Sequence, residues 1–402
     1  MKAYREKRNP GRLLLFLFAA LLSLSACVPG RVARIGENGF QPEEDERRLW
    51  KEGRELQMRF DRSGLVYEDA SLRSYVSRVA SKILPEKIGK EIGFETKILK
   101  HPAPNAFALP HGALYIHTGF LARMENEAQL AAVLGHETSH VIHRHALQTF
   151  RNVKQAAAFA TTLGVIGAPA GLYGLGAVAL GTVGALAAVS GYSQGLEEEA
   201  DAEGLRLMVN AGYDPGEAPK VIENVKRYVE EEKINEPFFF STHPRLEERK
   251  ASYQRFLDIE YKGRTGFRGK EEFAANMAPA IFENALLEMA RGRFAMAQEG
   301  MEKSLAVEPG NWKVHFSLGE LFRQRGLEGD LERAEKAYRT AIDLEPRFAA
   351  AHRGMGLLYY KKGRADLARE RFVRYLEIDP GAKDRAYIEQ YLGEITTEKA
   401  VP

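Results

Sequence analysis

The segment 134–145, Leu-Gly-His-Glu-Thr-Ser-His-Val-Ile-His-Arg-His, constrains this chain most, because it places an HExxH pattern in a helix-forming stretch. Residues four apart on a helix lie one above the other, so His136 and His140 can present two imidazole nitrogens to one zinc ion. Glu137 lies beside them, where its carboxylate can accept a proton from water on the zinc. Such a site needs a third protein ligand, which must come from another segment.

A third ligand is available in the acidic segment 196–204, Leu-Glu-Glu-Glu-Ala-Asp-Ala-Glu-Gly, whose first residues are typical of a helix start. Glu197 and Asp201 are four apart and can share a face turned toward the histidines. Glu197 would complete a His, His, Glu set with water in the fourth position, as in catalytic zinc sites. On spacing alone, Glu198 and Glu199 remain rival ligands.

The residues after the motif distinguish among classes of zinc protease. A metzincin would have glycine at position 143 and histidine at position 146, but the chain has His143 and Ala146, which excludes that class. His143 follows His140 by three residues and could compete as a ligand. We expect it instead to lie beside the ligands or at the surface.

The first residues predict export. A basic start is followed by the apolar run 13–25, which is too short to span a bilayer comfortably, so residues 1–26 indicate a secretory signal; an uncleaved anchor helix is the alternative. Leu24-Ser-Ala-Cys27 resembles the bacterial lipobox, which implies lipid attachment at Cys27 and membrane anchoring. Because Val28 rather than Asp follows, the resemblance favours the outer membrane.

Charge and cysteine content exclude two further possibilities. Cys27 is the only cysteine among the 402 residues, so no disulfide can form within one chain. The formal net charge of +2 falls to about −2 once residues 1–26 are removed. We therefore expect no nucleic acid partner.

Hydrophobic periodicity predicts the elements that precede the zinc motif. Helical spacing extends over 46–62 and 70–84, and apolar runs bounded by proline and glycine predict strands at 94–99 and 113–117. The strand at 113–117 precedes the zinc helix, as the substrate-pairing sheet edge does in many zinc proteases. An ordinary sheet strand is the alternative. We further expect residues 156–190, which carry no charge, to form a buried or membrane-facing helical pair.

An internal repeat occupies the last third of the chain. Pro309, Pro346 and Pro380 each end a unit, with alanines at equal distances before them. The middle unit is longer by three residues, near 327–330. This pattern resembles the tetratricopeptide repeat, a helix pair that stacks on its neighbours. We expect the array to bind peptide or protein partners, with residues 383–395 as its capping helix.

Residues 46–250 resemble metallopeptidase family forty-eight, the group that includes HtpX and the CAAX prenyl proteases. Four separated features carry the resemblance: Asn105-Ala-Phe-Ala-Leu-Pro-His-Gly112, the block 135–145, Glu197-Glu-Glu-Ala-Asp201 with Gly204, and Ser241-Thr-His-Pro244 leading to Arg249.

The resemblance implies roles for individual residues. It makes Glu197 the third zinc ligand and commonly gives the aspartate, here Asp201, a proton-donor role. A carboxylate beside zinc can equally orient a ligand histidine, which is the role we expect. It places His243 and Arg249 near the active site, where Arg249 could stabilise an oxyanion and His243 could assist or cap the zinc in a closed state. His111 replaces a glycine common in the family.

The sequence thus predicts a mainly α protein with a small β-sheet: a zincin-like HExxH metallopeptidase domain followed by an α-solenoid of tetratricopeptide repeats. The expected parts are a lipoprotein signal peptide at 1–26, a tether at 27–45, the peptidase domain at 46–260, a linker at 261–275, and the repeats with their capping helix at 276–395.

The resemblance implies a membrane-tethered endopeptidase with one Zn²⁺ per chain: His136, His140 and Glu197 as ligands, with Glu137, Asp201, His243 and Arg249 as catalytic residues. The implied place is the periplasmic face of the bacterial outer membrane. The implied partners are unfolded or misassembled envelope proteins, and outer-membrane assembly machinery bound by the repeats. The alternative is a chaperone-like adaptor with latent or no proteolysis.

Overall fold

The computed structural model describes residues 32–38, 40–162, 191–232, 243 and 246–398. The predictions for the signal segment 1–26, for Cys27 and for most of the uncharged segment 156–190 lie outside these residues. None of the described helices has both the length and the apolar character needed to cross a membrane.

The sheet has three strands in the order β1-β3-β2: β1 at Glu95–Leu99, β2 at Ala106–Ala108 and β3 at Ala113–His117. β1 runs parallel to β3, and β2 runs antiparallel to it. The sheet-edge interpretation of 113–117 is therefore wrong and its alternative, an ordinary sheet strand, is correct, because β3 is the central strand and all five of its residues are buried. The edge strand β2 was not predicted, since three residues show no alternation of apolar and polar side chains.

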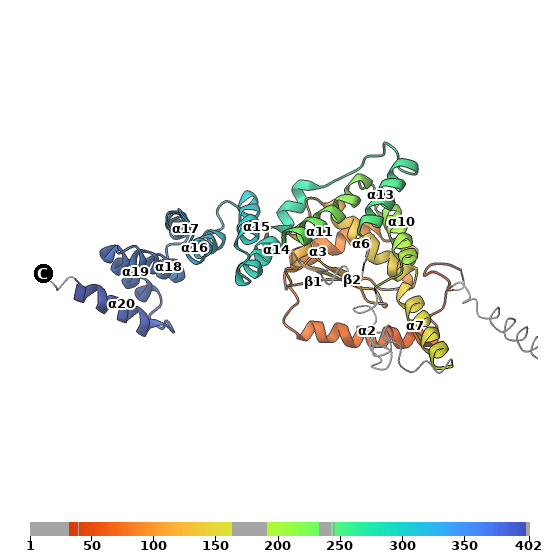
Figure 1. The fold of residues 1–402 in the computed structure, drawn as a ribbon, viewed down its shortest axis with the longest axis horizontal. Helices are drawn as coiled ribbons and strands as arrows, with labels where there is room; N and C mark the ends of the chain where they lie inside the picture. The colour runs from red at the N-terminus through yellow and green to blue at the C-terminus, as the bar shows by residue number, and fades with distance from the viewer. Residues whose placement is uncertain (1–31, 39, 163–190, 233–242, 244–245, 399–402) are drawn as a thin grey trace, which may run out of the picture.

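The helices before the repeats lie on both sides of this sheet in Figure 1. The two predicted at 46–62 and 70–84 are confirmed. The apolar stripe of the second one is buried, and its first turn is capped by the Asp69 side chain, which accepts from the Leu72 backbone N–H. The helices are α2 Glu44–Arg62, α3 Ala70–Ile83, α4 Glu86–Glu91, α5 Thr118–Leu121, α6 Glu127–Ile142, α7 His145–Thr162, α10 Gln194–Asn210, α11 Ala218–Glu232 and α13 Leu246–Ile259, with a short 3₁₀ turn at Pro215–Glu217.

Helix α6 carries the HExxH motif through the centre of this unit. Every residue from Glu127 to Ile142 is buried, and Asn126 caps the first turn by accepting from the Gln129 backbone N–H. A helix buried on all sides must satisfy its polar side chains against other protein groups. The histidines of α6 therefore face buried partners, which α10 and α13 supply.

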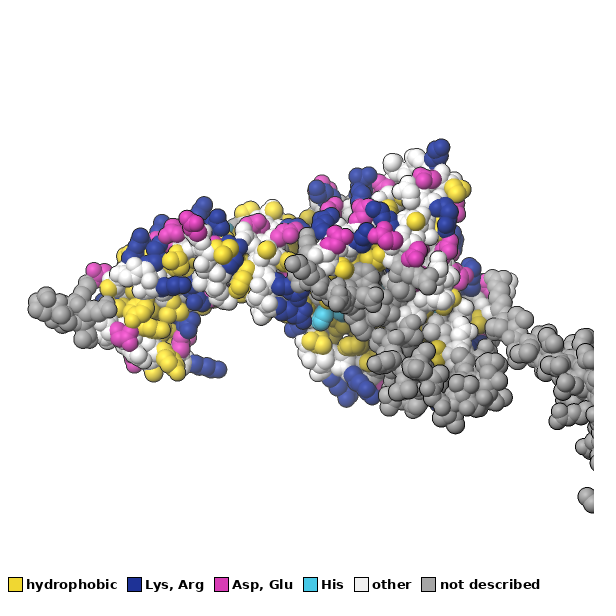
Figure 2. Space-filling view, viewed as in Figure 1, with side chains coloured by type: hydrophobic (Ala, Val, Ile, Leu, Met, Phe, Trp, Pro, Cys, Tyr) yellow, Lys and Arg dark blue, Asp and Glu magenta, His cyan; other side chains and the backbone are white. Residues whose placement is uncertain are grey.

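The C-terminal helices form the three predicted pairs and a final helix, and they extend from the peptidase unit as an arm (Figure 1). Small residues permit the close crossings: a Cβ on Gly319 or Gly354 would meet the ring of Tyr338, and one on Gly356 would meet Phe372. The helices are α14 Lys270–Ala290, α15 Phe294–Val307, α16 Trp312–Arg325, α17 Asp330–Leu344, α18 Ala349–Lys361, α19 Ala365–Ile378 and α20 Arg385–Glu398. On the visible face, basic, acidic and hydrophobic side chains are interspersed (Figure 2).

The segment between the two parts lies against the peptidase unit. Helix α14 begins at Lys270, inside the stretch expected to be a linker. Before it, Phe267 exchanges backbone hydrogen bonds with Gly212 and Asp214, and the Arg268 side chain donates to the buried Asp214 carboxylate. These contacts attach the start of the arm to the end of α10.

Candidate metal centre

Four side chains from three parts of the chain converge beside the C-terminal half of α6. The Nε2 atoms of His136 and His140 lie 3.0 Å apart, and the Glu197 carboxylate lies 3.4 Å from the first and 3.6 Å from the second. His243 completes the group, with Nδ1 3.2 Å from His136 Nε2 and 3.0 Å from a Glu197 oxygen. All four residues are buried. The structure thus brings together the three predicted ligands and His243, which the family resemblance had placed near the active site.

This donor set fits a metal ion. One donor atom from each residue can be chosen so that all four lie within 4.8 Å of one another. Ligands about 2.0–2.1 Å from a tetrahedral zinc are separated by roughly 3.4 Å, close to the spacings found here. Two imidazoles with a carboxylate form a typical catalytic zinc set, and a fourth protein ligand would close the open position.

Glu137 lies next to these four side chains but is not one of the four metal donors. Its side chain is buried, and among the described residues no hydrogen-bond partner reaches its Oε1 atom. The His243 imidazole lies nearby, with Nε2 3.4 Å from that oxygen. A buried acceptor without a partner is unusual in a folded protein and is typical of a site that acts on a ligand.

Asp201 lies behind His136, on the side away from the other ligands. Its carboxylate is 2.8 Å from His136 Nδ1 and accepts two hydrogen bonds from Arg249, at 2.9 and 2.6 Å, and one from the Tyr253 hydroxyl. A carboxylate bound to the outer nitrogen of a ligand histidine fixes its tautomer and ring orientation. This position would allow Asp201 to orient His136, so the orienting role stays a prediction.

The surroundings set the charge of these groups. Burial raises the pKa of Glu197, but His243 and Arg249 outweigh it and hold that pKa well below 4.5. The pKa of Asp201 is likewise lowered, because Arg249 and His136 outweigh the effect of burial. Burial, with the neighbouring His136, lowers the pKa of His140 well below 6.5. The two carboxylates are thus ionised and His140 is neutral, the forms that bind metals. For His136, in contrast, burial and Arg249 lower the pKa, but Asp201 and Glu197 outweigh them and raise it to about 9, so a metal has to displace a proton there.

The rival ligands lie elsewhere. Glu198 forms an exposed ion pair with Arg255. Glu199 contacts His143 Nδ1 at 2.7 Å and His145 Nε2 at 3.2 Å. These two histidines are buried on the far side of His140, so His143 is not a ligand of the first group.

Three contacts in the centre were not predicted. Tyr253 bonds Asp201, Tyr192 stacks on the His140 ring with 4.0 Å between centroids, and His145 contacts the outer nitrogen of His140. Only His145 gave a sequence signal, as part of the HETSHVIHRH block, but five-residue spacing does not indicate a shared helical face.

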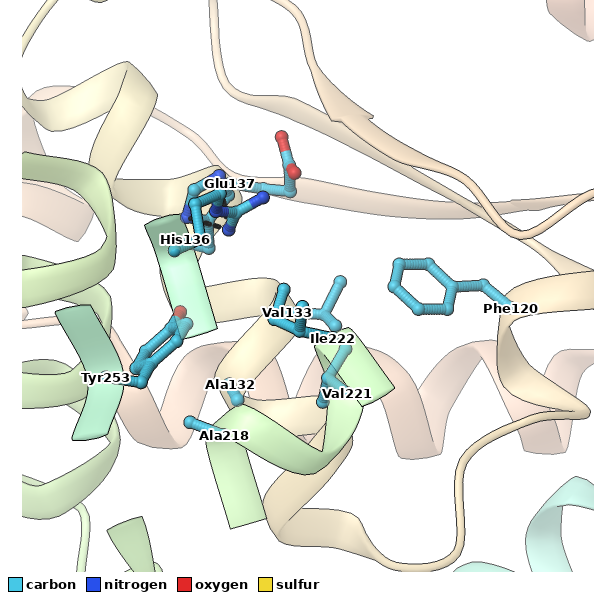
Figure 3. Close-up of a pocket in the computed structure, with 10 residues that line it drawn as sticks. Phe120, Ala132, Val133, His136, Glu137, Ala218, Val221, Ile222 and Tyr253 are labelled. Carbon is cyan, nitrogen blue, oxygen red and sulfur yellow. Dashed lines mark hydrogen bonds between the residues drawn. The ribbon is translucent and has the colours of Figure 1, made fainter. Parts of the chain in front are cut away.

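A pocket opens beside the centre (Figure 3). His136 and Glu137 lie at one end and Phe120 at the other, with Val133 and Ile222 between them. The remaining lining residues are Ala132, Ala218, Val221, Arg249 and Tyr253. The polar groups therefore meet at one end of a mainly apolar pocket, as in many ligand sites.

Two glycines set the separation of the two ligand-bearing helices. A Cβ on Gly204 of α10 would lie 2.8 Å from the His136 backbone nitrogen, and one on Gly135 of α6 would lie 2.9 Å from the Gly204 carbonyl oxygen. Such distances are below van der Waals contact, so only glycine permits this crossing. It brings Glu197 within reach of the α6 histidines.

We expect Gly204→Ala to lower the free energy of unfolding by about 1–3 kcal/mol and to weaken metal binding, because the added methyl forces α10 away from α6. Gly195→Ala is the matched control, because Gly195 lies in the same helix and a Cβ there would meet no neighbouring atom within 4 Å. Chemical denaturation and a metal-binding titration check both variants. Equal behaviour of the two would show that the close crossing does not position Glu197.

Comparison with known proteins agrees with this geometry. The sequence pattern of peptidase family M48 matches residues 67–255, and that of the tetratricopeptide repeat matches residues 328–383. The chain is 29% identical over 192 residues to the beta-barrel assembly-enhancing protease of Yersinia pestis, a match that covers 45% of this chain and 37% of that protein. The protein of the same name from Escherichia coli is 24% identical over 287 residues, covering 62% and 58%.

A mitochondrial protein is also similar to this chain. The mitochondrial metalloendopeptidase OMA1 of Schizosaccharomyces pombe is 32% identical over 183 residues, covering 46% of this chain and 52% of that protein. This chain thus spans between 37% and 58% of the length of these three relatives. The family and the fold class expected from the sequence are confirmed. Residues 67–255 belong to peptidase family M48, and the chain joins this peptidase domain to C-terminal tetratricopeptide repeats.

Proposed function

We propose that this protein is a zinc-dependent endopeptidase in which His136, His140 and Glu197 hold one Zn²⁺. The observation that carries the proposal is the convergence of these buried donors beside Glu137, whose Oε1 has no hydrogen-bond partner among the described residues. The endopeptidase and protease relatives support peptide-bond hydrolysis. A zinc ion bound there would supply Lewis acidity, polarising a carbonyl and making water more acidic.

The protein's own groups then perform the proton transfers. Glu137 accepts a proton from the attacking water at Oε1 and delivers it to the leaving amine nitrogen. Arg249 also lines the pocket, and its Nη1 has no hydrogen-bond partner among the described residues, although Glu197 Oε2 is 3.5 Å away. This guanidinium can donate to the developing oxyanion of the attacked amide.

His243 gives the site a closed form. Its Nδ1 lies among the metal donors, where it can take the fourth position, and its Nε2 lies 3.4 Å from Glu137 Oε1, in the space that an attacking water would need. We expect His243→Ala to hydrolyse casein severalfold faster than the wild type, because the fourth position opens. Initial rates at saturating zinc check this. Slower hydrolysis would show instead that the imidazole takes part in the reaction.

The test of the proposal is the zinc content of the purified chain, measured by elemental analysis in the wild type and in Glu197→Gln, together with casein hydrolysis. We expect about one zinc per wild-type chain, and less zinc and less cleavage in the variant, since a neutral amide is a poor substitute for a ligand carboxylate. Circular dichroism controls for folding. A wild-type chain that binds no zinc would contradict the mechanism.

For the cellular role, we propose a lipoprotein anchored through Cys27 in the bacterial outer membrane and facing the periplasm. There it would cleave misfolded or misassembled envelope proteins. The relatives named beta-barrel assembly-enhancing protease support this assignment. The repeats would bind substrates or outer-membrane assembly machinery, as stacked helix pairs do.

A chaperone-like adaptor with latent or no proteolysis is the second candidate, favoured by the position of His243 among the metal donors. The two differ in their need for Glu137, since an adaptor has no use for a general base.

A further inference from the structure

His140, the second of the two proposed histidine ligands, contacts two further side chains that lead away from the metal centre. His140 Nε2 faces His136, while its Nδ1 lies 2.8 Å from Nδ1 of His145. His145 Nε2 in turn lies 3.2 Å from an oxygen of Glu199. The His140 and His145 rings are buried, and Glu199 is partly exposed.

The contact between the two rings depends on a break in the helix. On a continuous α-helix, residues five apart point about 140° away from each other. Here α6 ends at Ile142, and Arg144 has a φ of 60° before α7 begins at His145. This sharp turn brings His145 back against His140.

The turn is held by an ion pair. Among the described residues, Arg144 is the only non-glycine with a positive φ, a conformation that costs about 1–2 kcal/mol for most residues. Its guanidinium donates to the Glu46 carboxylate at 2.9 and 2.5 Å and to the Ala33 carbonyl oxygen at 2.9 Å, and both charged side chains are buried. Helix α2 thus holds the turn that positions His145.

Proton counting gives each nitrogen one role. Two nitrogens 2.8 Å apart need one hydrogen and one lone pair between them. If His140 Nε2 binds the metal, the hydrogen of the neutral ring is on Nδ1, which donates to His145 Nδ1. His145 then carries its hydrogen on Nε2 and donates it to Glu199. Every nitrogen along this path is satisfied.

We propose that His145 and Glu199 are a positioning pair that fixes the tautomer and ring orientation of His140 for metal binding. The inference rests on the zinc site of the proposed function. Asp201 lies against the outer nitrogen of His136 and can fix that ring directly. For His140 the acceptor on the outer nitrogen is His145 Nδ1, and Glu199 in turn fixes the His145 ring.

The same residues, with His143, form a second group that is spaced to hold a metal. A metal on His145 Nε2 would move the His145 hydrogen to Nδ1, facing His140 Nδ1. His140 would then carry its own hydrogen on Nε2 and lose its place in the first site. Glu199 moreover already accepts from Arg34 at 3.0 Å. The contacts therefore favour the hydrogen-bonded pair over a second metal site.

The test compares His145→Asn with His145→Gln. The asparagine oxygen can occupy the place of Nδ1 and accept from His140, whereas the glutamine amide lies one methylene farther out, near the place of Nε2. We expect His145→Gln to bind zinc about 10–100-fold more weakly than the wild type, the usual effect of losing such a partner, and His145→Asn to lose clearly less. Dissociation constants come from competition with a chelator.

Two controls separate positioning from packing. If His145 only filled space, glutamine, which is closer to histidine in volume, would retain zinc better than asparagine, the reverse of the expected order. His352→Gln, a buried histidine in α18 whose hydrogen bond to the Pro346 carbonyl oxygen a glutamine can keep, should bind zinc as the wild type does.

The tautomer of His140 can also be observed directly. Histidine ¹⁵N resonances of the zinc-loaded wild type should show its Nδ1 protonated, and the glutamine variant should change that signal. Equal zinc affinity in both His145 variants and the wild type would overturn the pair. Two zinc ions per chain, with one lost in His143→Ala, would overturn it in favour of a second metal site. A wild type that binds no zinc would overturn the proposed function and this inference with it.

Discussion

Glu137→Gln is expected to hydrolyse casein about 10²–10⁴-fold more slowly than the wild type while binding zinc normally, because the amide cannot accept the proton of the attacking water. Glu137 lies beside the donor cluster and is not one of its members, so the metal centre keeps all its donors. Initial rates with zinc content measured on the same preparations test this. Undiminished hydrolysis would remove Glu137 from the mechanism.

The same substitution should leave stability unchanged or raise it. The wild type buries an ionisable carboxylate whose Oε1 has no hydrogen-bond partner among the described residues, and a neutral amide is less costly to bury. Chemical denaturation of the two proteins provides the folding control. In cells, loss of function in this variant would support the protease, and full function would support the adaptor.

Arg249→Met is expected to lower the free energy of unfolding by about 3–5 kcal/mol, more than Gly204→Ala, because it leaves buried carboxylates without their cation. Arg249 donates to Asp201 through Nε and Nη2 and lies 3.5 Å from Glu197, and all three side chains are buried. The free energy of unfolding is measured with a chelator present, so that metal binding does not contribute.

Arg255→Met is the matched control for this variant. Arg255 lies in the same helix, and its ion pair with Glu198 is exposed, with half of each side chain accessible. Its loss should change stability by less than about 1 kcal/mol. The double variant Asp201→Asn with Arg249→Met should lose less than the sum of the single changes. Similar effects of the two arginine substitutions would show that the buried pair does not stabilise the centre.

Local sequence pattern predicted a feature correctly wherever that feature depends on a single segment of the chain. The HExxH spacing placed His136 and His140 on one helical face, the apolar run after Pro110 and Gly112 placed β3 at its observed bounds, and the proline and alanine periods placed the three repeat pairs. These features depend on helix and strand periodicity, which the order of residues specifies directly.

The choice of Glu197 over Glu198 and Glu199 came from family resemblance, because the three are adjacent and spacing cannot separate them. The structure separates them through the Gly135–Gly204 crossing, which turns Glu197 toward the histidines. The central position of β3 also lay beyond local pattern, since strand order depends on which segments pair across the sheet.

The sequence by itself thus determined the motif helix, the acidic helix that supplies the third donor, and the repeat array. The family resemblance had named Asp201, His243 and Arg249 as site residues, but the tertiary structure alone decided their contacts, which are His243 against Glu197 and Asp201 between His136 and Arg249. It also added His145 against His140. The reason is physical. These contacts join residues from separate helices, or follow a turn with positive φ at Arg144, and no helical period encodes either.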